Sequence, residues 1–194
     1  MAQKSSKNTR GKIISAAWTL FYDQGYDATT IDEIVALSET SKGSFYHYFD
    51  GKDALLGTLA YLFDEKYEEL EEQLPAYDRC YDKLIFLNQE LFGMVENSIS
   101  LDLLARLLST QLVTRGEKHL LDRSRLYYRL LRKIFQEGQE NGELRADLTI
   151  NEMVKIYAVA ERALLYDWCI CNGEYSLKSY ASSTMPLFIG NLQK

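Results

Sequence analysis

Only two prolines, Pro75 and Pro186, interrupt the 194 residues of this chain, and 11 glycines are its other strong helix breakers. Between these points apolar residues recur every three or four positions, which predicts amphipathic helices rather than strands. Such sparse punctuation suits helices better than a turn-rich β architecture. We therefore expect an all-α fold, with a length that allows one or two small domains.

No apolar run approaches the ~18–20 residues needed to span a bilayer, and the polar segment 1–10 has no apolar secretory core behind it. We therefore expect a cytoplasmic protein with no membrane partner. A net charge of −6 is unusual for a nucleic-acid-binding chain, but most of the negative excess follows Lys52. The first dozen residues are instead basic, through Lys4, Lys7, Arg10 and Lys12.

The chain contains three cysteines, Cys80, Cys169 and Cys171, and two histidines, His47 and His119. Three cysteines make no disulfide framework, and no histidine lies close enough in sequence to complete a metal site. Buried reduced thiols are the simplest interpretation. A redox sensor is the alternative, although no basic neighbours favour a thiolate. We expect neither a metal nor a cofactor.

The first 75 residues contain the patterns of four helices. Thr30 and Glu33 form a capping box, in which each side chain accepts from the other residue's backbone amide. Gly25 suits a left-handed helix stop. The expected helices are about Thr9–Gln24, Thr30–Leu37, Ser41–Phe49 and a long helix over Gly51–Leu74 that Pro75 ends.

The rest of the chain also predicts helices, one of which begins with a second capping box at Thr149 and Glu152. Pro186 lies inside the last helix and predicts a kink or an early break there. The expected helices are Asp78–Asn97, Leu101–Val113, Glu117–Glu140, Thr149–Cys171 and Leu177–Leu192.

The segment Ser41–Asp50 has the pattern of a short helix that presents polar groups to another molecule. At ~100° per residue, Phe45 and Phe49 share one face, which must pack on the first two helices. A glycine on the other face weakens the helix but allows close approach of a partner. The outer face carries Gly43, Tyr46 and His47, with Ser44 at its edge. A polar surface helix without a partner is the alternative interpretation.

Lys52 favours a partner. It lies in the first turn of the next helix, where the helix dipole attracts anions and disfavours a lysine. An external phosphate there would accept hydrogen bonds from both the amides and the ammonium. Thr30 begins the second helix and is a similar position, for which simple capping is the alternative. A helix of this kind after a short polar turn fits the major groove of DNA.

The segment Arg10–Leu56 resembles the DNA-binding domain of the TetR (tetracycline-repressor) family of transcriptional regulators. Its Ala28–Gly43 part is most similar to the multidrug-binding repressors of that family. The resemblance is specific because several fixed spacings are satisfied together. The matching residues are Ile14, Ala17, Phe21, Gly25, Tyr26, Thr29, Thr30, Ile34, Ser41, Lys42, Gly43, Tyr46, Phe49, Lys52, Leu55 and Leu56.

The resemblance implies an N-terminal three-helix helix-turn-helix domain, residues 1–52, and a C-terminal helical bundle for ligand binding and dimerisation, residues 53–194. Positions that hold the DNA backbone are matched by Thr30, Tyr46, His47 and Lys52. The edge that meets bases or nearby phosphates is matched by Thr40, Ser41, Lys42, Gly43 and Ser44. Tyr48 matches a contact position in some members, although the helical wheel turns it toward the core.

One position departs from the family pattern. Many members have a glycine in the helix-turn-helix turn where this chain has Glu39. A glutamate with a left-handed backbone costs about 1 kcal/mol, so we expect the turn to differ slightly. We also expect its negative charge to weaken or orient DNA binding.

The segment Met153–Cys171 is apolar nearly all round, so it needs partners on two sides. In the family that the chain resembles, the last two helices of each subunit form a four-helix bundle, and we expect a homodimer. A fully internal helix in a monomer is the alternative. Glu161, Arg162 and Asp167 interrupt the apolar pattern, either as solvated ends or, as we prefer, as an ion-paired group at the dimer seam.

The chain also supplies 14 Tyr, 8 Phe and 2 Trp. An apolar pocket with polar hydroxyl tips is typical of a small-molecule site, while ordinary core packing is the alternative for each aromatic residue. The candidate ligand-binding residues are Phe86, Phe92, Tyr127, Tyr128, Tyr157 and Trp168.

Together these features predict a homodimeric repressor that binds a palindromic double-stranded DNA operator and is released by an unknown small-molecule effector. An alternative is a DNA-bound adaptor or activator whose C-terminal domain binds a partner protein; a large exposed apolar patch without a cavity would favour it. An enzyme is not expected, because the sequence offers no nucleophile with a base, no metal-ligand spacing and no glycine-rich phosphate loop.

Overall fold

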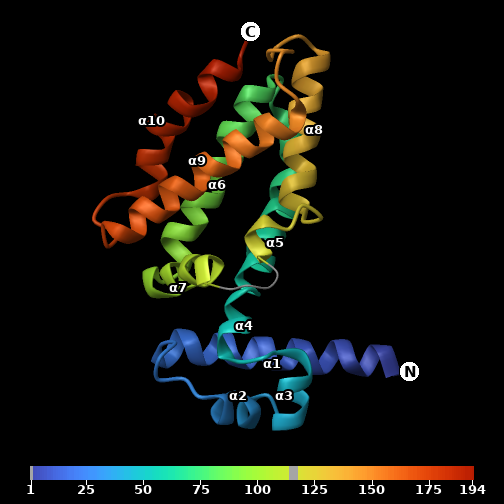
Figure 1. The fold of residues 1–194 in the computed structure, drawn as a ribbon, viewed down its shortest axis with the longest axis vertical. Coiled ribbons are helices and arrows are strands. Elements are labelled where there is room, and N and C mark those ends of the chain that lie inside the picture. Colours follow the sequence, from blue (N-terminus) through green and yellow to red (C-terminus); the bar gives the residue numbers. More distant parts are fainter. Residues whose placement is uncertain (1, 114–117) are drawn as a thin grey trace. The chain divides into compact units, whose positions relative to one another are not determined.

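The computed structural model describes the backbone of residues 2–113 and 118–194, and within those ranges the side chains from residue 9 onward. The chain folds into helices α1 to α10, with short 3₁₀ turns between some of them (Figure 1). The described ranges contain no strand beyond an isolated bridge between Leu144 and Gln193. The expected all-α fold is therefore confirmed.

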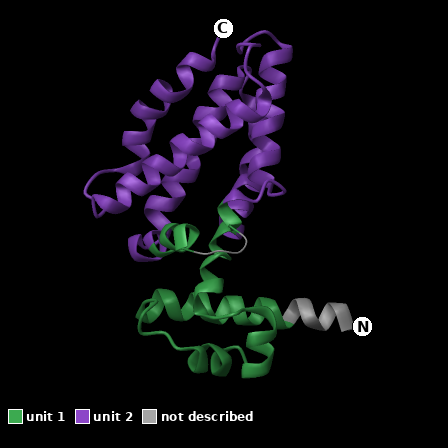
Figure 2. Ribbon diagram, in the orientation of Figure 1, with its two compact units in different colours: residues 1–60, 106–120 green, residues 61–105, 121–194 purple. Residues whose placement is uncertain are grey.

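The helices divide between two compact units (Figure 2). Unit 1 comprises residues 1–60 and 106–120, and unit 2 comprises residues 61–105 and 121–194. Two helices therefore have residues in both units, namely α5 (Leu59–Glu71) and α7 (Leu101–Val113). No described helix is both long and apolar enough to cross a membrane.

Unit 1 contains α1 (Ala2–Gln24), α2 (Ile31–Leu37), α3 (Lys42–Tyr48) and α4 (Lys52–Leu56). The first helix begins earlier than the predicted Thr9, and the basic side chains of Lys4 and Lys7 lie outside the described side chains. The core of unit 1 consists of the apolar face of α1, which is closed by one or two side chains from each of α2, α3 and α4. The fully buried residues include Ile13, Ala17, Phe21, Ile34, Phe45 and Leu55.

The predicted long helix over Gly51–Leu74 is wrong, because the chain turns between α4 and α5. The Thr58 hydroxyl donates to the Leu55 carbonyl (2.6 Å) and accepts from the Trp18 indole N–H (2.8 Å). Side-chain bonding of this kind competes with the helical backbone ladder. Gly57 also contacts the His119 ring so closely that a Cβ at this position would overlap it. The turn is therefore fixed by tertiary contacts.

In unit 2, α6 (Cys80–Ser98) packs against α8 (Leu126–Glu140) and α10 (Leu177–Ile189), and α9 (Ile150–Ile170) packs against the same two helices (Figure 1). The capping box predicted at Thr149 begins α9. The buried residues of these four helices include Leu84, Phe92, Leu131, Phe135, Met153, Tyr157, Ala181 and Met185.

Two further predicted boundaries in this part of the chain are wrong. Of the helix expected over Glu117–Glu140, Glu117 lies outside the described residues. Within them the helix begins only at Leu126, because the Asp122 carboxylate accepts from the Ser124 amide (2.8 Å) and forms a turn. The last α-helix passes through Pro186 without an early break and ends at Ile189, where a 3₁₀ turn follows.

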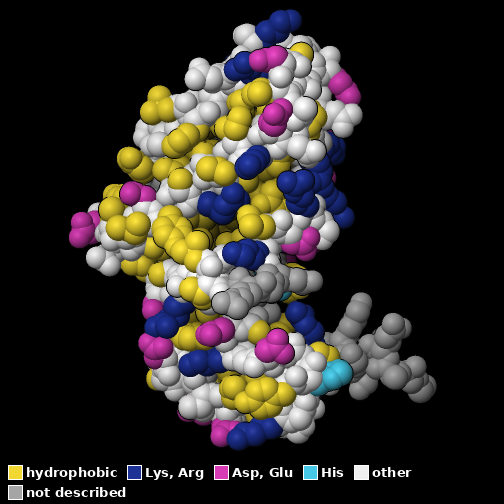
Figure 3. Space-filling view, in the orientation of Figure 1, with side chains coloured by type: hydrophobic (Ala, Val, Ile, Leu, Met, Phe, Trp, Pro, Cys, Tyr) yellow, Lys and Arg dark blue, Asp and Glu magenta, His cyan; other side chains and the backbone are white. Residues whose placement is uncertain are grey.

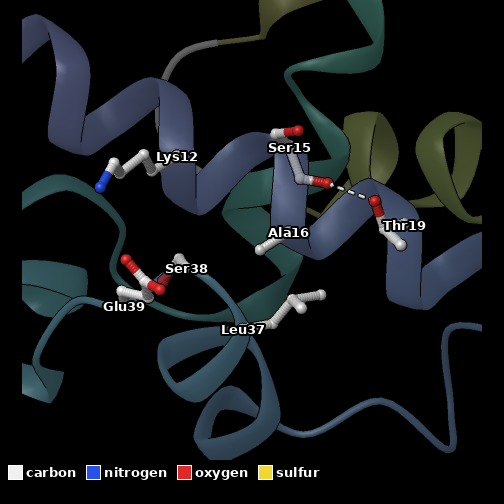
Figure 4. Close-up of a pocket in the computed structure, with 7 residues that line it drawn as sticks. All are labelled: Lys12, Ser15, Ala16, Thr19, Leu37, Ser38 and Glu39. Carbon is white, nitrogen blue, oxygen red and sulfur yellow. Dashed lines mark hydrogen bonds between the residues drawn. The ribbon is translucent and has the colours of Figure 1, made fainter.

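The turn between α2 and α3 keeps a left-handed residue at Glu39, with φ of 52°. The Glu39 amide donates to the Ala36 carbonyl (3.2 Å) and the Thr40 amide to the Val35 carbonyl (3.1 Å), which is the Schellman arrangement that usually ends in glycine. The turn therefore retains the geometry that a glycine would give. Glu39 borders an open hollow of about 330 Å³ between α1 and this turn, with Lys12 across from it (Figure 4).

We expect Glu39→Gly to raise the free energy of unfolding by about 1 kcal/mol, because glycine adopts positive φ without the Cβ penalty. Glu39→Ala is the matched control, since it removes the same charge but keeps the strained backbone. Urea unfolding of both variants measures the difference. Equal stability of the two would show that the left-handed turn stores no strain.

Candidate nucleic-acid interface

Helix α3 is built to expose one face and bury the other. The Ser41 hydroxyl caps it by accepting from the Ser44 amide (3.1 Å). Phe45 is fully buried and Phe49 is 5% exposed, as the helical periodicity predicts. Their rings lie 5.7 Å apart. Two aromatic side chains one turn apart thus anchor the helix and fix which residues face outward.

The outward face carries the residues expected there. Lys42, Gly43, Tyr46 and His47 are exposed, and Ser44 lies at the edge, half-buried. Lys42 forms an exposed ion pair with Asp32 on α2 (2.7 Å), a contact that an outside phosphate can replace at little cost. This face offers hydroxyl, phenol, imidazole and ammonium groups, which suit DNA bases and phosphates.

Thr40 and Tyr48 occupy less open positions. The Thr40 hydroxyl shares a hydrogen bond with that of Ser38 (2.8 Å), and both Thr40 and Tyr48 are half-buried. The Tyr48 ring packs edge-on against His47. The predicted DNA contacts of these two residues therefore use only part of each side chain.

Thr30 forms the predicted capping box. Its hydroxyl accepts from the Glu33 amide (3.2 Å), and the Glu33 carboxylate accepts from the Thr30 amide (2.7 Å). The bond from the Thr30 amide, together with a second one that the Thr30 hydroxyl donates to the same carboxylate (2.8 Å), lowers the pKa of Glu33. Thr30 is exposed, so the cap and the predicted phosphate contact are compatible.

Lys52 has a partner inside the protein. Its ammonium donates to the carbonyls of Tyr26 (2.6 Å) and Thr29 (2.8 Å) and lies over the Tyr26 ring, 4.2 Å from its centre. A lysine ammonium has three donors, so the two carbonyls leave one for a phosphate. Lys52 therefore has a structural role that sequence reasoning missed, and its third donor is compatible with the predicted phosphate contact.

The segment 25–29, between α1 and α2, is held by two more side chains within unit 1. The Tyr26 hydroxyl donates to Asp53, and Arg106 of α7 pairs with Asp27. The Arg106 guanidinium also lies 4.9 Å from the centre of the Tyr26 ring. The start of α2 is therefore tied to α4 and to α7. No motif in the sequence marked Arg106.

The six aromatic residues predicted to bind a ligand lie in different surroundings. Phe92 and Tyr157 are fully buried, and the Tyr127 and Tyr128 rings are in contact with a centre distance of 4.8 Å. Phe86 instead stacks on Tyr77. Trp168 donates to the Tyr175 carbonyl (2.8 Å) at the end of α9.

A buried carboxylate lies in the core of unit 2. Glu161 on α9 is 4% exposed, and its oxygens accept from the Asn88 amide (3.0 Å) and the Tyr127 hydroxyl (2.6 Å). Burial raises the pKa of Glu161, although these hydrogen bonds and Arg162 act in the opposite direction. The preferred placing of Glu161 at a dimer seam is therefore wrong, because its side chain points into the domain.

Tyr67 and Tyr157 complete this buried polar cluster with Asn88, Tyr127 and Glu161. The Tyr157 hydroxyl donates to the Leu84 carbonyl (2.9 Å), and the Tyr67 ring packs on that of Tyr127. The Tyr67 hydroxyl and Asn88 Oδ1 are buried and make no hydrogen bond within the described part of the chain. Such atoms call for an explanation, and a ligand group is one.

The cluster was visible in part from the sequence. Asn88 lies four residues after Leu84, and Glu161 four residues after Tyr157, so each lies on the apolar face of its helix. A polar residue at such a position is an informative exception to hydrophobic burial. Tyr67 carried no comparable signal.

The cysteines show no sign of redox reactivity. Burial raises the pKa of the Cys80 thiol to about 12 and that of Cys169 to about 11, and the pKa of Cys171 is also raised. A thiol with a raised pKa stays protonated at neutral pH and is a poor nucleophile. The described residues also include no cluster of metal ligands.

We expect replacement of Lys42 to change DNA affinity and replacement of Lys52 to change stability. Lys42→Gln should lower the salt slope of DNA affinity by about one with stability unchanged. Lys52→Met should lower the free energy of unfolding by about 1–3 kcal/mol, because two carbonyls lose a charged donor. Urea unfolding and binding titrations across salt concentrations measure both, with Lys133→Gln in unit 2 as the control. A Lys52→Met protein of unchanged stability would refute the structural role.

Glu161 should make stability depend on pH. Because its pKa is raised in the folded state, the folded protein holds the proton more tightly than the unfolded chain does. The stabilisation is complete below the ordinary pKa of about 4.3 and is lost as pH rises through the folded-state pKa. As pH rises from the ordinary pKa through the folded-state pKa, the wild-type protein should therefore lose stability relative to the Glu161→Gln variant. The Glu174→Gln variant is the control, and its stability should follow the same pH dependence as that of the wild type. A Glu161→Gln variant whose free energy of unfolding has the same pH dependence as the wild type would contradict a raised pKa of Glu161.

The sequence and the fold are similar to those of known bacterial transcriptional regulators. Residues 13–59 match the family model described as bacterial regulatory proteins, tetR family. The HTH-type transcriptional regulator QacR of Staphylococcus aureus is 29% identical over 164 residues, which cover 81% of this chain and 82% of QacR. The HTH-type transcriptional repressor DhaR of Mycobacterium sp. is 26% identical over 149 residues, covering 72% of this chain and 71% of DhaR.

The fold is similar to that of Thermus thermophilus FadR, a TetR family transcriptional repressor solved in complex with lauroyl-CoA. The TM-score is 0.80 at 23% identity, over 94% of each chain. Bacillus subtilis FadR in complex with stearoyl-CoA gives a TM-score of 0.69 at 20% identity, over 94% of this chain and 98% of that one. The matched segment contains the capped α2, the turn and the exposed α3, and the relatives are regulators rather than enzymes. Residues 13–59 therefore match the DNA-binding domain of the TetR family of bacterial transcriptional regulators, and the chain as a whole is similar in sequence and fold to regulators of that family.

Proposed function

We propose that the protein is a homodimeric repressor that binds a palindromic operator through α3 of each subunit and is released by a small molecule bound in unit 2. Operator binding implies a cytoplasmic location. The observation that carries the proposal is the polar outer face of α3 on its buried base of Phe45 and Phe49. In this proposal residues 1–52 bind DNA, through Thr30, Thr40–Ser44, Tyr46–Tyr48 and Lys52, while residues 53–194 bind the effector and the second subunit.

Exposed apolar side chains on the last two helices support the dimer. On α9, Val159 and Ile170 are 48% and 70% exposed, and on α10, Leu187 and Phe188 are 78% and 45% exposed. Large exposed apolar groups on adjoining helices favour burial against another protein surface. A second copy is the occupant that also supplies a second α3 for the other half of a palindrome.

The buried polar cluster supports a ligand in unit 2, because Tyr67 and Asn88 retain hydrogen-bonding capacity there. The two FadR structures were solved with acyl-CoA molecules in proteins of the same fold. A small organic effector is therefore the simplest regulator of this chain. It acts by binding the DNA-free form more tightly, and coupling of this kind is typically about 5- to 150-fold in affinity.

Two helices offer routes for coupling, since α5 and α7 have residues in both units. Arg106 of α7 contacts Asp27 and Tyr26, next to the cap of α2. A ligand that shifts α7 would therefore move a side chain that holds the segment before the DNA-binding helices.

Selection of bound DNA from a random library tests the proposal. The expected result is a palindromic site whose half-sites lie about one helical turn apart. A screen of small molecules, with lauroyl-CoA included, should then return a compound that weakens binding to this site. Recovery of no preferred sequence would refute the DNA-binding role, and a single unpaired half-site would refute the dimer.

Arg106→Gln should reduce the effector's effect on operator affinity to less than half of the wild-type fold-change, because it removes both contacts with the 25–29 segment. Asp27→Asn should have a smaller effect, since it keeps the guanidinium over the Tyr26 ring. Fluorescence anisotropy of labelled operator, with and without the effector found in the screen, measures both. A full response in Arg106→Gln would exclude this route.

A further inference from the structure

A cavity of about 290 Å³ lies in unit 2 between α8, α9 and the segment before α8. Its charged lining consists of Arg123, Arg132, Lys155 and Arg162, and among the described residues no aspartate or glutamate lines it. Figure 3 shows Lys and Arg side chains gathered over α8 and α9 on this face, in a protein whose net charge is −6. The cavity is therefore a local concentration of positive charge.

Among the residues that the structure describes, ion pairs do not neutralise the four cations. Within the described part of the chain none of them forms a salt bridge with a carboxylate, and Arg132 instead donates to the Arg123 carbonyl (3.2 Å). That bond holds the Arg132 guanidinium against the segment before α8. Like charges held around one hollow repel each other, so an anion in the cavity would relieve the repulsion. Guanidinium groups bind phosphate through paired hydrogen bonds.

The inner wall of the cavity is apolar and leads toward the buried polar cluster. Tyr128, Val154 and Ala158 line the cavity and are buried. Tyr128 adjoins Tyr127 in sequence and in ring contact, and Arg162 influences Glu161 electrostatically. A ligand here would thus touch the neighbours of both Tyr127 and Glu161.

We propose that this cavity binds the phosphate-bearing head group of an anionic amphiphile, whose apolar part lies along Tyr128, Val154 and Ala158. The volume suits a head group and is smaller than that of most sites for whole drug-sized ligands. The inference rests on the proposed function and names the chemical class of its effector. The expected order of contacts is cations at the rim, then the apolar wall.

Calorimetric titration with two C12 amphiphiles of opposite charge tests the head-group preference. Dodecyl phosphate should bind at least about tenfold more tightly than dodecyltrimethylammonium, both below their micelle concentrations. Inorganic phosphate should bind more weakly than dodecyl phosphate, because it lacks the apolar contact. Equal binding of the two amphiphiles, or tighter binding of the cationic one, would overturn the proposal.

Single-charge variants locate the site. Arg132→Gln and Lys155→Gln should each weaken dodecyl phosphate binding by about tenfold, a loss typical of one charged hydrogen bond. Arg129→Gln on α8 is the control, since this exposed arginine does not line the cavity. Thermal unfolding establishes that the variants are folded. Unchanged affinity in both cavity variants, or an equal loss in the control, would overturn the assignment.

Operator release distinguishes this inference from the proposed function. If dodecyl phosphate releases the operator from the wild type but not from Lys155→Gln, the cavity is the effector site. If another compound releases the operator and dodecyl phosphate does not bind, the repressor role stands and the inference fails. Cavity variants that instead lose affinity for mixed-sequence DNA while they still bind dodecyl phosphate would show that the four cations bind nucleic acid. That result would also overturn the inference.

Discussion

The contacts that fix the segment 25–29 are the interactions on which the DNA-binding unit depends. This segment ends α1 with a left-handed glycine and leads directly into the cap of α2, so its position sets where α2 and then α3 lie. The ammonium of Lys52 reaches two of its carbonyls from α4, Asp53 accepts from its tyrosine, and Arg106 reaches it from α7. A loop without regular structure is thereby fixed by charged and aromatic contacts.

Unit 2 depends on a different kind of constraint. Four helices enclose an apolar core, yet a carboxylate with its amide and phenol partners lies inside it. A buried carboxylate costs stability unless it is hydrogen-bonded or protonated. A core that retains such a group, with the Tyr67 hydroxyl and Asn88 Oδ1 unbonded within the described part of the chain, gives up stability for binding capacity. Neighbouring cations on the α8–α9 surface extend that capacity to charged ligands.

Local patterns predicted the fold where local interactions determine it. The capping boxes at Thr30 and Thr149, the glycine that ends α1 and the two phenylalanines beneath α3 all follow from spacing over a few residues. The prediction of one long helix over Gly51–Leu74 was wrong because distant residues decide the conformation there. The turn between α4 and α5 is fixed by Trp18 and His119, neither of which is near it in sequence.

The same distinction applies to the candidate site. The outward residues of α3 were predictable because helix geometry alone fixes their direction. The second role of Lys52, the contacts of Arg106 and the cations around the α8–α9 cavity were not predictable, because each depends on which segments meet in the fold. Asn88 and Glu161 are intermediate cases, since their positions on apolar helix faces were visible but the bond between them was not.

We propose that occupancy of unit 2 is transmitted to the segment before the DNA-binding helices. Hydrogen exchange of the full chain, with and without saturating dodecyl phosphate, tests it most directly, because exchange reports local opening residue by residue. We expect altered exchange in residues 24–30 and 106–113 in addition to α8 and α9. Changes confined to unit 2, with the exchange of residues 24–30 unaltered, would contradict it.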